Sequence, residues 1–488
     1  MSFPIIFGAM AGVVALYLCT ATLYNVLVHP LRDIPGPILF RASVLPKSYY
    51  MITGVLQFKV KSLHDKYGAI VRIAPNEISV VGAGAWNDIY GRRPSGGGEL
   101  SKYYNFYVLE ESSPRDIINA EPAQHRMLRR LLAHGFSERS MHAQGSIISG
   151  YIDILISSLR SKCDDGDAVV DLNKWLNWTT FDIIGNLSFG SDASNLRSAE
   201  WTPWVKASAK HNKSMAIVAC LKGLGFGKLI KLAIRCGLLP TQGYLDYIKS
   251  HVKERAQLGV ERPDFIEGLI QKQNGLSLDE IARNAEALIG AGSESTATFL
   301  SGVIYALLTH PEWLDKLTTE IRSTFKSEAE IDFTSVKHLD YMLACLNETF
   351  RYYPPVTNGM PRIAPKGGTL ICGTFVPENT VVAIWQWAIC HDTTLWTDPY
   401  EFRPERFLGD KNFKNDKLEA LQPFSIGTRN CIGRNLSYAE TKLILARLIY
   451  NFDMKIHHSS KNWMQLQKAY FVWDPPALNI TLCRRSVA

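Results

Sequence analysis

The most informative stretch of the sequence, residues 423–436, reads Pro-Phe-Ser-Ile-Gly-Thr-Arg-Asn-Cys-Ile-Gly-Arg-Asn-Leu. Its one cysteine, Cys431, lies between Gly427 and Gly433 and just before a run, Leu436 to Tyr450, whose apolar residues recur at helical spacing. Cys431 is therefore expected at a helix N-terminus, where free N–H groups and the helix dipole stabilise a thiolate and lower the pKa of the thiol. The two glycines are expected to let the backbone turn and a flat ligand approach.

Three interpretations of Cys431 compete. An unpaired cysteine is most often a small buried apolar residue. A zinc site is disfavoured because no second Cys or His stands at ligand spacing. A thiolate can also hold haem iron, where it favours O–O cleavage.

The pattern Phe-x-x-Gly-x-Arg-x-Cys-x-Gly around this cysteine resembles the haem-binding signature of the cytochrome P450 superfamily. The resemblance implies haem b as cofactor, with the Cys431 thiolate as the axial ligand of its iron. It also implies that Phe424 and Arg429 contact the cofactor.

Composition places the chain among globular proteins, since 46% of its 488 residues are hydrophobic and 20% are charged. Length alone suggests two or three domains. The resemblance implies instead one catalytic domain, residues 41–488, mainly α with a small β region, behind a membrane anchor.

The net charge of +7 comes from scattered basic residues without a nucleic-acid motif, so a membrane surface or an acidic protein is the expected partner, and not nucleic acid. The nine cysteines form an odd set without a CxxC pair, which is typical of a reducing compartment.

The N-terminus predicts a transmembrane anchor at residues 1–28. Residues 4–28 carry no charge, and 25 residues of helix would span about 37 Å against a hydrocarbon core of about 30 Å. A cleaved signal peptide is disfavoured because a basic segment before the apolar run is missing and the run is long. Basic residues follow the span, which predicts a single-pass protein with a cytosolic catalytic domain. Residues 29–40 are proline-rich and resemble the hinge of microsomal P450 enzymes, which implies the endoplasmic reticulum membrane.

His125 and Arg129 are one turn apart on a predicted helix. A basic helix is usually only a solvated face. The matching helix of the family has Trp where His125 stands, and its Trp and Arg contact a haem propionate. Histidine keeps a ring N–H donor. Arg362 matches a further propionate ligand of the family.

A capping box, Ser277 to Glu280, opens a long predicted helix that ends before His310-Pro311. Its middle, residues 291–296, reads Ala-Gly-Ser-Glu-Ser-Thr. Hydroxyls that bond back to the i−4 carbonyl could simply bend this helix. The segment also resembles the oxygen-activation motif of the family, with Ser295 where threonine is usual, so Glu294, Ser295 and Thr296 are the expected catalytic residues.

Glu348 and Arg351 form an i,i+3 pair on a predicted helix, a weak signal alone. Residues 402–407 resemble the second half of a family signature in which Arg406 completes a structural Glu-Arg-Arg network. Upstream, residues 69–81 predict a hairpin with a Pro-Asn turn. The loop after it is rich in aromatic residues, which either line a substrate pocket or pack under a long loop; these are Tyr103, Tyr104, Phe106 and Tyr107.

The resemblance implies insertion of one atom of O2 into an apolar small molecule, with electrons from NADPH through cytochrome P450 reductase. The hinge and the cysteine stretch resemble fungal enzymes of secondary metabolism such as trichothecene-type hydroxylases, which suggests a terpenoid or polyketide substrate. Two alternatives are a haem-thiolate isomerase or dehydratase that needs no reductase, and a non-catalytic haem sensor. Glu294 and Ser295 argue against the isomerase, and a sensor needs neither a long grooved helix nor an apolar pocket.

Overall fold

Helices dominate the structure, a computed structural model that describes residues 3–92, 98–107, 113–202, 205, 211–236, 242–259, 262–271 and 275–485. The N-terminal half contains α1 (Phe3–Leu23), the π-helical turn η1 (Tyr24–Val28), α2 (Ile38–Ala42), α3 (Leu45–Ile52), α4 (Leu56–Tyr67), α5 (Ala85–Tyr90), α6 (Tyr104–Tyr107), α7 (Pro122–Ala133), α8 (Glu138–Lys162), α9 (Leu172–Phe189), α10 (Asn195–Ser198), α12 (His211–Gly223) and α13 (Gly227–Arg235). The C-terminal half contains α14 (Gln242–Gln257), α15 (Glu267–Ile270), α16 (Leu278–Thr309), α17 (Pro311–Thr324), α18 (Asp340–Tyr352), α19 (Gln386–Cys390) and α20 (Arg434–Asn451).

Among the described residues, the strands form four small antiparallel or mixed sheets. They are β1 (Ile70–Ala74), β2 (Glu77–Val80), β3 (Ser101–Lys102), β4 (Ala168–Asp171), β5 (Arg362–Ile363), β6 (Thr369–Ile371), β7 (Thr374–Val376), β8 (Val381–Ala383), β9 (Phe452–Ile456), β10 (Lys468–Tyr470), β11 (Val472–Asp474) and β12 (Asn479–Arg484). The largest sheet has the order β1-β2-β8-β5-β3, and the others pair β4-β12-β9, β6-β7 and β10-β11. The fold is therefore mainly α with small β regions, as the sequence predicts.

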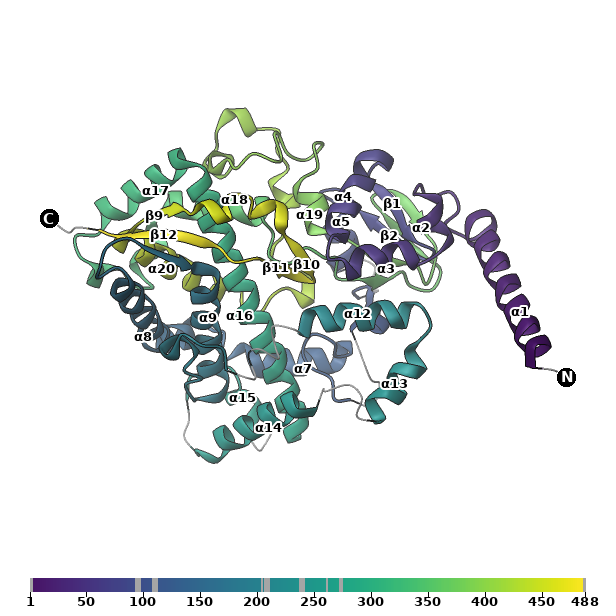
Figure 1. Ribbon diagram of the computed structural model, residues 1–488, viewed down its shortest axis with the longest axis horizontal. Helices are drawn as coiled ribbons and strands as arrows, with labels where there is room; N and C mark the ends of the chain where they lie inside the picture. The colour runs from purple at the N-terminus through teal and green to yellow at the C-terminus, as the bar shows by residue number, and fades with distance from the viewer. Residues whose placement is uncertain are drawn as a thin grey trace.

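The long helix α16 runs through the middle of the molecule (Figure 1). Ser277 caps it through a capping box with Glu280, as predicted, and the helix ends at Thr309 before Pro311. It packs against α9, α14, α18 and α20, and from residue 296 to residue 308 every side chain is buried. These helices share the larger apolar core, whereas a second apolar core joins α3, α4, α5 and the β1-β2 hairpin.

The predicted hairpin is confirmed, with β1 and β2 antiparallel and Ile70 opposite Val80. The alternating stretch Thr380 to Ala388 predicts one strand, and this is wrong in its second half. β8 ends at Ala383, and Gln386 starts helix α19. Every residue from 381 to 390 is buried, so the alternation of residue types did not mark an exposed and a buried face.

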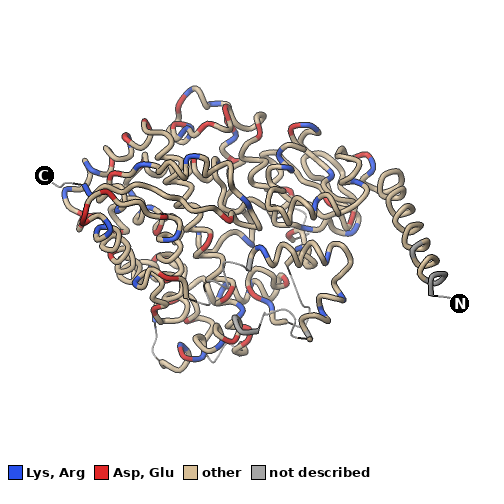
Figure 2. The backbone as a smooth tube through the Cα atoms, in the orientation of Figure 1, with Lys and Arg blue, Asp and Glu red and all other residues tan. Residues whose placement is uncertain are grey.

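The N-terminal helix projects from the body (Figure 1) and carries no charge (Figure 2). Residues Phe7–Val28 are long and apolar enough to cross a membrane, and none of that stretch is buried in the protein. The proline-rich segment after it is docked, because Leu31 is fully buried and the Pro35 carbonyl accepts from the Arg72 N–H at 2.8 Å. A Cβ on Gly36 would lie 2.4 Å from the Arg72 carbonyl oxygen, so glycine is needed at this close approach.

Candidate active site

The loop that carries Cys431 is held by its own backbone. The Cys431 N–H donates to the Phe424 carbonyl at 2.8 Å, and Gly433 precedes the first turn of α20. Gly427 has φ of +78°, and a Cβ there would lie 2.1 Å from the Tyr90 carbonyl oxygen. Gly427 is therefore required by the turn, whereas Gly433 has ordinary backbone angles and space for a Cβ.

The sequence predicts a lowered pKa for Cys431, and this prediction is wrong for the protein without a ligand. Burial raises the pKa of the thiol above its usual value, and the Gly433 N–H and the Arg129 charge offset this only partly. The side chain is nevertheless accessible to water. The surrounding protein therefore removes most of the solvation of the thiol although the residue keeps exposed surface, and a positive partner is needed to hold the thiolate.

Cationic side chains gather beside this loop. This cationic cluster consists of Lys102, Arg129, Arg362 and Arg429, with the ring of His125 beside them, and its members come from β3, α7, β5 and the cysteine loop. Arg129 donates to the Asn430 carbonyl and side chain at 2.6 and 2.5 Å, and so ties α7 to the residue before Cys431. Arg429 pairs with Glu99 and donates to the Ala120 carbonyl at 2.9 Å.

The charges of the cationic cluster are not balanced within the described part of the chain. Burial has the largest effect on Lys102 and lowers the pKa of its ammonium group, and the charges of Arg362 and Arg429 lower this pKa further. The carboxylates of Asp116 and Glu99 act in the opposite direction. Burial, with Arg429 and Arg129, lowers the pKa of His125 to about 4, so this ring is neutral at pH 7. Arg362 Nε is buried without a partner. Ligand carboxylates would complete this cluster.

The predicted Glu-Arg-Arg network is fully buried in the structure. Glu348 accepts from Arg351 at 2.7 and 2.8 Å and from Arg406 at 3.3 Å, and all three side chains have no exposed surface. Sequence reasoning missed its fourth member, Asp416, which pairs with Arg406. Arg351 also donates to the Pro399 and Glu401 carbonyls, and the network thereby joins α18 to the segment that leads to the cysteine loop.

On α16 the motif residues occupy different environments. Gly292 faces α9, because a Cβ there would lie 3.1 Å from Ile184, and Thr296 is buried one turn later. Ala291 is exposed and Ser295 is half-buried, whereas the helix is buried from residue 296 to residue 308. Ser295 Oγ donates to the Ala291 carbonyl at 2.6 Å. The open strip of the helix therefore carries Ser295, and the i−4 bond considered from the sequence is also present.

Glu294 is the acid of this strip. Burial raises its pKa to about 8, a hydrogen bond from the Asn212 side chain lowers it, and the charge of Asp474 raises it. A carboxyl with this pKa is mostly protonated at pH 7 and can donate a proton. The partner Asn212 lies on α12, 82 residues away, and the sequence contains no signal for it.

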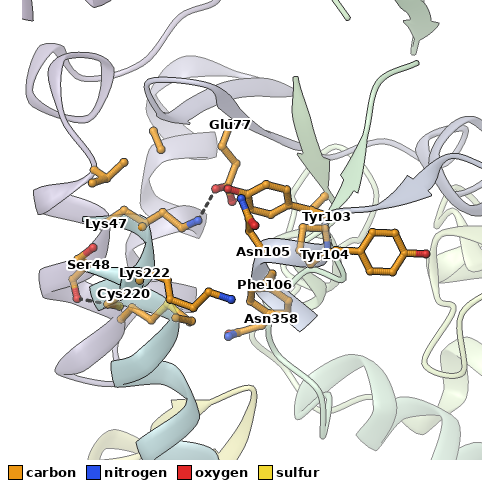
Figure 3. A pocket seen from close by; sticks show the side chains of 18 of the residues that line it. Lys47, Ser48, Glu77, Tyr103, Tyr104, Asn105, Phe106, Cys220, Lys222 and Asn358 are labelled. Carbon is orange, nitrogen blue, oxygen red and sulfur yellow. Dashed lines mark hydrogen bonds and ion pairs between the residues drawn. The ribbon is translucent and has the colours of Figure 1, made fainter. Parts of the chain in front are cut away.

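A cavity of about 550 Å³ opens beside the second apolar core (Figure 3), and Met51, Cys220 and Trp385 belong both to its wall and to that core. Tyr103, Tyr104 and Phe106 line it together with Ala219 and Cys220 of α12. These three aromatic residues therefore line a cavity, while the interpretation that they line the substrate pocket stays a prediction. Tyr107 does not line the cavity and packs instead under Lys102, whose Nζ lies 4.2 Å from the ring centre.

Comparisons with known proteins agree along almost the whole chain. A family model described as Cytochrome P450 matches residues 35–482. The chain belongs to the cytochrome P450 family. Cytochrome P450 monooxygenase 1 of Neocamarosporium betae is 56% identical to it over 96% of each chain. Cytochrome P450 monooxygenase tpeC of Talaromyces stipitatus is 46% identical over 94% of this chain and 91% of its own. The trichothecene C-15 hydroxylase of Fusarium sporotrichioides is 40% identical over 96% of each.

P450 enzymes are monooxygenases that hold haem through a cysteine thiolate, and the residues of this chain fit that cofactor. Cys431 keeps exposed surface, so its thiol is open to a ligand. Beside it, the positive charges of the cationic cluster outnumber the carboxylates that act on them. The buried Nε of Arg362 has no hydrogen-bond acceptor among the described residues. Two propionates would supply the missing negative charge. Phe424 packs against Phe350 and Tyr438, with ring centres 5.1 and 5.3 Å away, which stiffens the loop before Cys431.

Proposed function

We propose that this P450 enzyme inserts one atom of O2 into an apolar small molecule of terpenoid or polyketide type, in a secondary-metabolite pathway. The observation that supports the proposal is on α16, where Glu294, an acid that burial keeps mostly protonated at pH 7, directly precedes the half-buried hydroxyl of Ser295 in the sequence. An isomerase or dehydratase acting on a peroxide has no need for protons delivered to O2. The name of the Fusarium relative, a hydroxylase of trichothecenes, supports the substrate class.

The proposed cofactor site uses residues already described. Cys431 would ligate the iron of haem b, and His125, Arg129, Arg362 and Arg429 would face its propionates. Haem held by a thiolate supplies the chemistry that activates O2. The chain supplies the protons for that step from Glu294 through Ser295, and Thr296 is turned toward α9.

The experiment that tests the function omits one component at a time. Full-length protein in membranes is incubated with NADPH, cytochrome P450 reductase, air and a metabolite extract from a strain that lacks the gene. Product that forms only when NADPH, reductase and O2 are all present supports the proposal. Product formation without reductase would favour the isomerase, and a haem protein that converts nothing in the extract would favour the sensor.

Ser295→Ala is expected to uncouple the enzyme. A positioned acid or hydroxyl contributes about 10² to 10⁴ in rate, and the alanine variant keeps the helix but loses the relay. We expect haem and substrate binding to remain while NADPH and O2 consumption yields hydrogen peroxide, measured against product. Ser295→Thr is expected to match or improve coupling, because the added methyl stiffens the side chain.

Thr296→Ala is the matched control for Ser295→Ala. One residue along a helix turns the side chain about 100°, and Thr296 is buried. Full coupling in Ser295→Ala together with uncoupling in Thr296→Ala would show that Thr296 is the donor. If both variants stay coupled, water or substrate supplies the proton.

We propose that the reductase binds near α7. Arg126 and Arg130 are exposed on the helix that holds His125 and Arg129, and Arg434 is exposed at the start of α20. Reversing the charge of Arg126 and Arg130 is expected to slow reductase-supported turnover severalfold, most at low ionic strength. Turnover driven by added peroxide should be spared. An equal loss in both assays would indicate a defect in folding or haem binding.

We propose that the enzyme is a single-pass protein of the endoplasmic reticulum membrane with a cytosolic catalytic domain. The uncharged span α1-η1 and the basic residues after it support this arrangement. A second apolar surface lies on α13 and its N-cap, where Phe226, Leu229 and Leu232 are 47%, 61% and 57% exposed. Such a patch is typical of a membrane contact.

Deletion of residues 1–28 is expected to leave a haem-binding protein that still sediments partly with membranes. Adding Leu229→Ser and Leu232→Ser to the truncated protein should release it, because the α13 surface loses its apolar residues. Sedimentation with liposomes measures the membrane binding of the truncated protein with and without the two substitutions. A truncated protein that cannot load haem would show that the anchor is part of the folded domain.

A further inference from the structure

The proposed proton donor Glu294 is held by a helix that belongs to the other apolar core. Asn212, in the first turn of α12, donates through its side-chain amide to Glu294 Oε2. α16 is part of the larger core, while the buried residues of α12, Ala216 and Cys220, belong to the second core with α3. The bond between Asn212 and Glu294 therefore joins the two cores.

The other end of α12 forms part of the cavity wall. Ala219 and Cys220 line the cavity, and the Cys220 thiol lies 3.8 Å from the Ser48 carbonyl oxygen of α3 (Figure 3). α12 packs against α3, α6, α13 and β10. Movement of α12 at the cavity therefore changes the position of Asn212 relative to Glu294.

The amide can act on the carboxyl in one specific way. An N–H of asparagine donates, so it needs an oxygen with a free lone pair, and in the protonated acid this is the carbonyl oxygen. With Oε2 engaged by Asn212, the transferable proton is held on Oε1. The same bond limits the rotation of the carboxyl group about its last torsion, which is otherwise broad.

Charged groups around this pair come from three elements. Asp474 on β11 acts on Glu294, and Lys213 on α12 and Lys468 on β10 act in turn on Asp474. Lys213 Nζ lies 5.5 Å from the ring centre of Tyr470 on β10. Asn212 is the neutral donor among these groups, and it reaches the carboxyl directly.

We propose that Asn212 is a positioning residue for Glu294, which orients the carboxyl for proton delivery to Ser295 and makes that delivery depend on the position of α12. The inference rests on the proposed function of Glu294. It predicts that removing the amide misdirects the proton without removing the acid.

The first test is an infrared pH titration of the purified holoprotein without substrate or reductase. The band of the protonated Glu294 carboxyl is assigned as the band lost in Glu294→Gln. Asn212→Leu, similar in size but without a donor, should raise the titration midpoint by about one pH unit, the size expected for a lost hydrogen bond to a charged group. Asn212→Asp should raise it further, because two carboxylates would then be adjacent.

Asn177→Leu is the matched control for this substitution. Asn177 lies on α9, and its amide donates to the Asn173 carbonyl at 2.8 Å, not to Glu294. The control should leave the midpoint unchanged. An unchanged midpoint in both Asn212 variants, or an equal shift in the control, would overturn the proposal. If Asn212→Leu fails to load haem, Asn212→Asp keeps the shape of the side chain and decides the question.

The second test measures peroxide against product in turnover. Asn212→Leu should raise the peroxide share severalfold and move the upper pH limit of coupling in step with the infrared midpoint. In a Glu294→Gln background the same substitution should add little, since both residues act on one path. Additive effects would overturn the proposal. The infrared result does not depend on turnover, so a protein that formed no product would refute the proposed function and still report on the Asn212 bond.

Discussion

Cys431→Ala should abolish the red-shifted band that the reduced protein gives with carbon monoxide, and product formation should fall to background. The band depends on a thiolate ligand, and Cys431 keeps exposed surface and has the Arg129 charge acting on its thiol. Cys163, Cys220, Cys345 and Cys390 are buried, and no member of the cationic cluster acts on their thiols. These four thiols are therefore not expected to replace Cys431 as the ligand.

The control for this prediction is Cys483→Ala. Cys483 is exposed on β12, away from the cysteine loop. Its replacement should leave the spectrum and the activity unchanged. Retention of the shifted band in Cys431→Ala would refute the assignment of the ligand.

Glu348→Gln should destabilise the folded protein by about 3 to 5 kcal/mol, because it leaves two buried arginines without their shared carboxylate. Burial alone would lower the pKa of Arg351, but the Glu348 charge and hydrogen bonds raise it above its usual value. Asp416 would remain for Arg406, and Arg351 would keep only carbonyl partners. We expect low haem loading in cells and a lower midpoint in chemical denaturation of the protein that does form.

Asp453→Asn is the matched control. It removes a carboxylate that pairs with Arg322 and whose side chain is 58% exposed. Exposed pairs contribute about 0 to 1 kcal/mol, so this variant should unfold near the wild-type midpoint. Equal midpoints for Glu348→Gln and wild type would show that the buried network does not stabilise the fold.

Local sequence patterns predicted the elements that depend on nearby residues. The capping box set the start of α16, the Pro-Asn turn set the β1-β2 hairpin, and Glu348 and Arg351 are one helical turn apart. The start of α19 was missed because the whole segment is buried.

Properties that depend on contacts distant in sequence could not be predicted. The pKa of Cys431 depends on how much solvent the whole fold removes, and this outweighs the local helix N-terminus. Asp416 and Asn212 were missed for the same reason, since each acts on a partner from another element. The cationic cluster was predicted in part: Lys102 joins it through β3, and Glu99, the partner of Arg429, comes from the loop before β3.

We propose above that this P450 enzyme transfers one oxygen atom from O2 to its substrate. The most direct measurement is mass spectrometry of the product formed from an extract of the gene-deletion strain, with NADPH, reductase and O2 enriched in the heavy isotope of oxygen. We expect one heavy oxygen atom in the product, and no labelled product when NADPH or reductase is omitted or when Cys431→Ala replaces the wild type. A product that contains no oxygen from O2, or that forms equally well without NADPH, would show that the enzyme is not a monooxygenase.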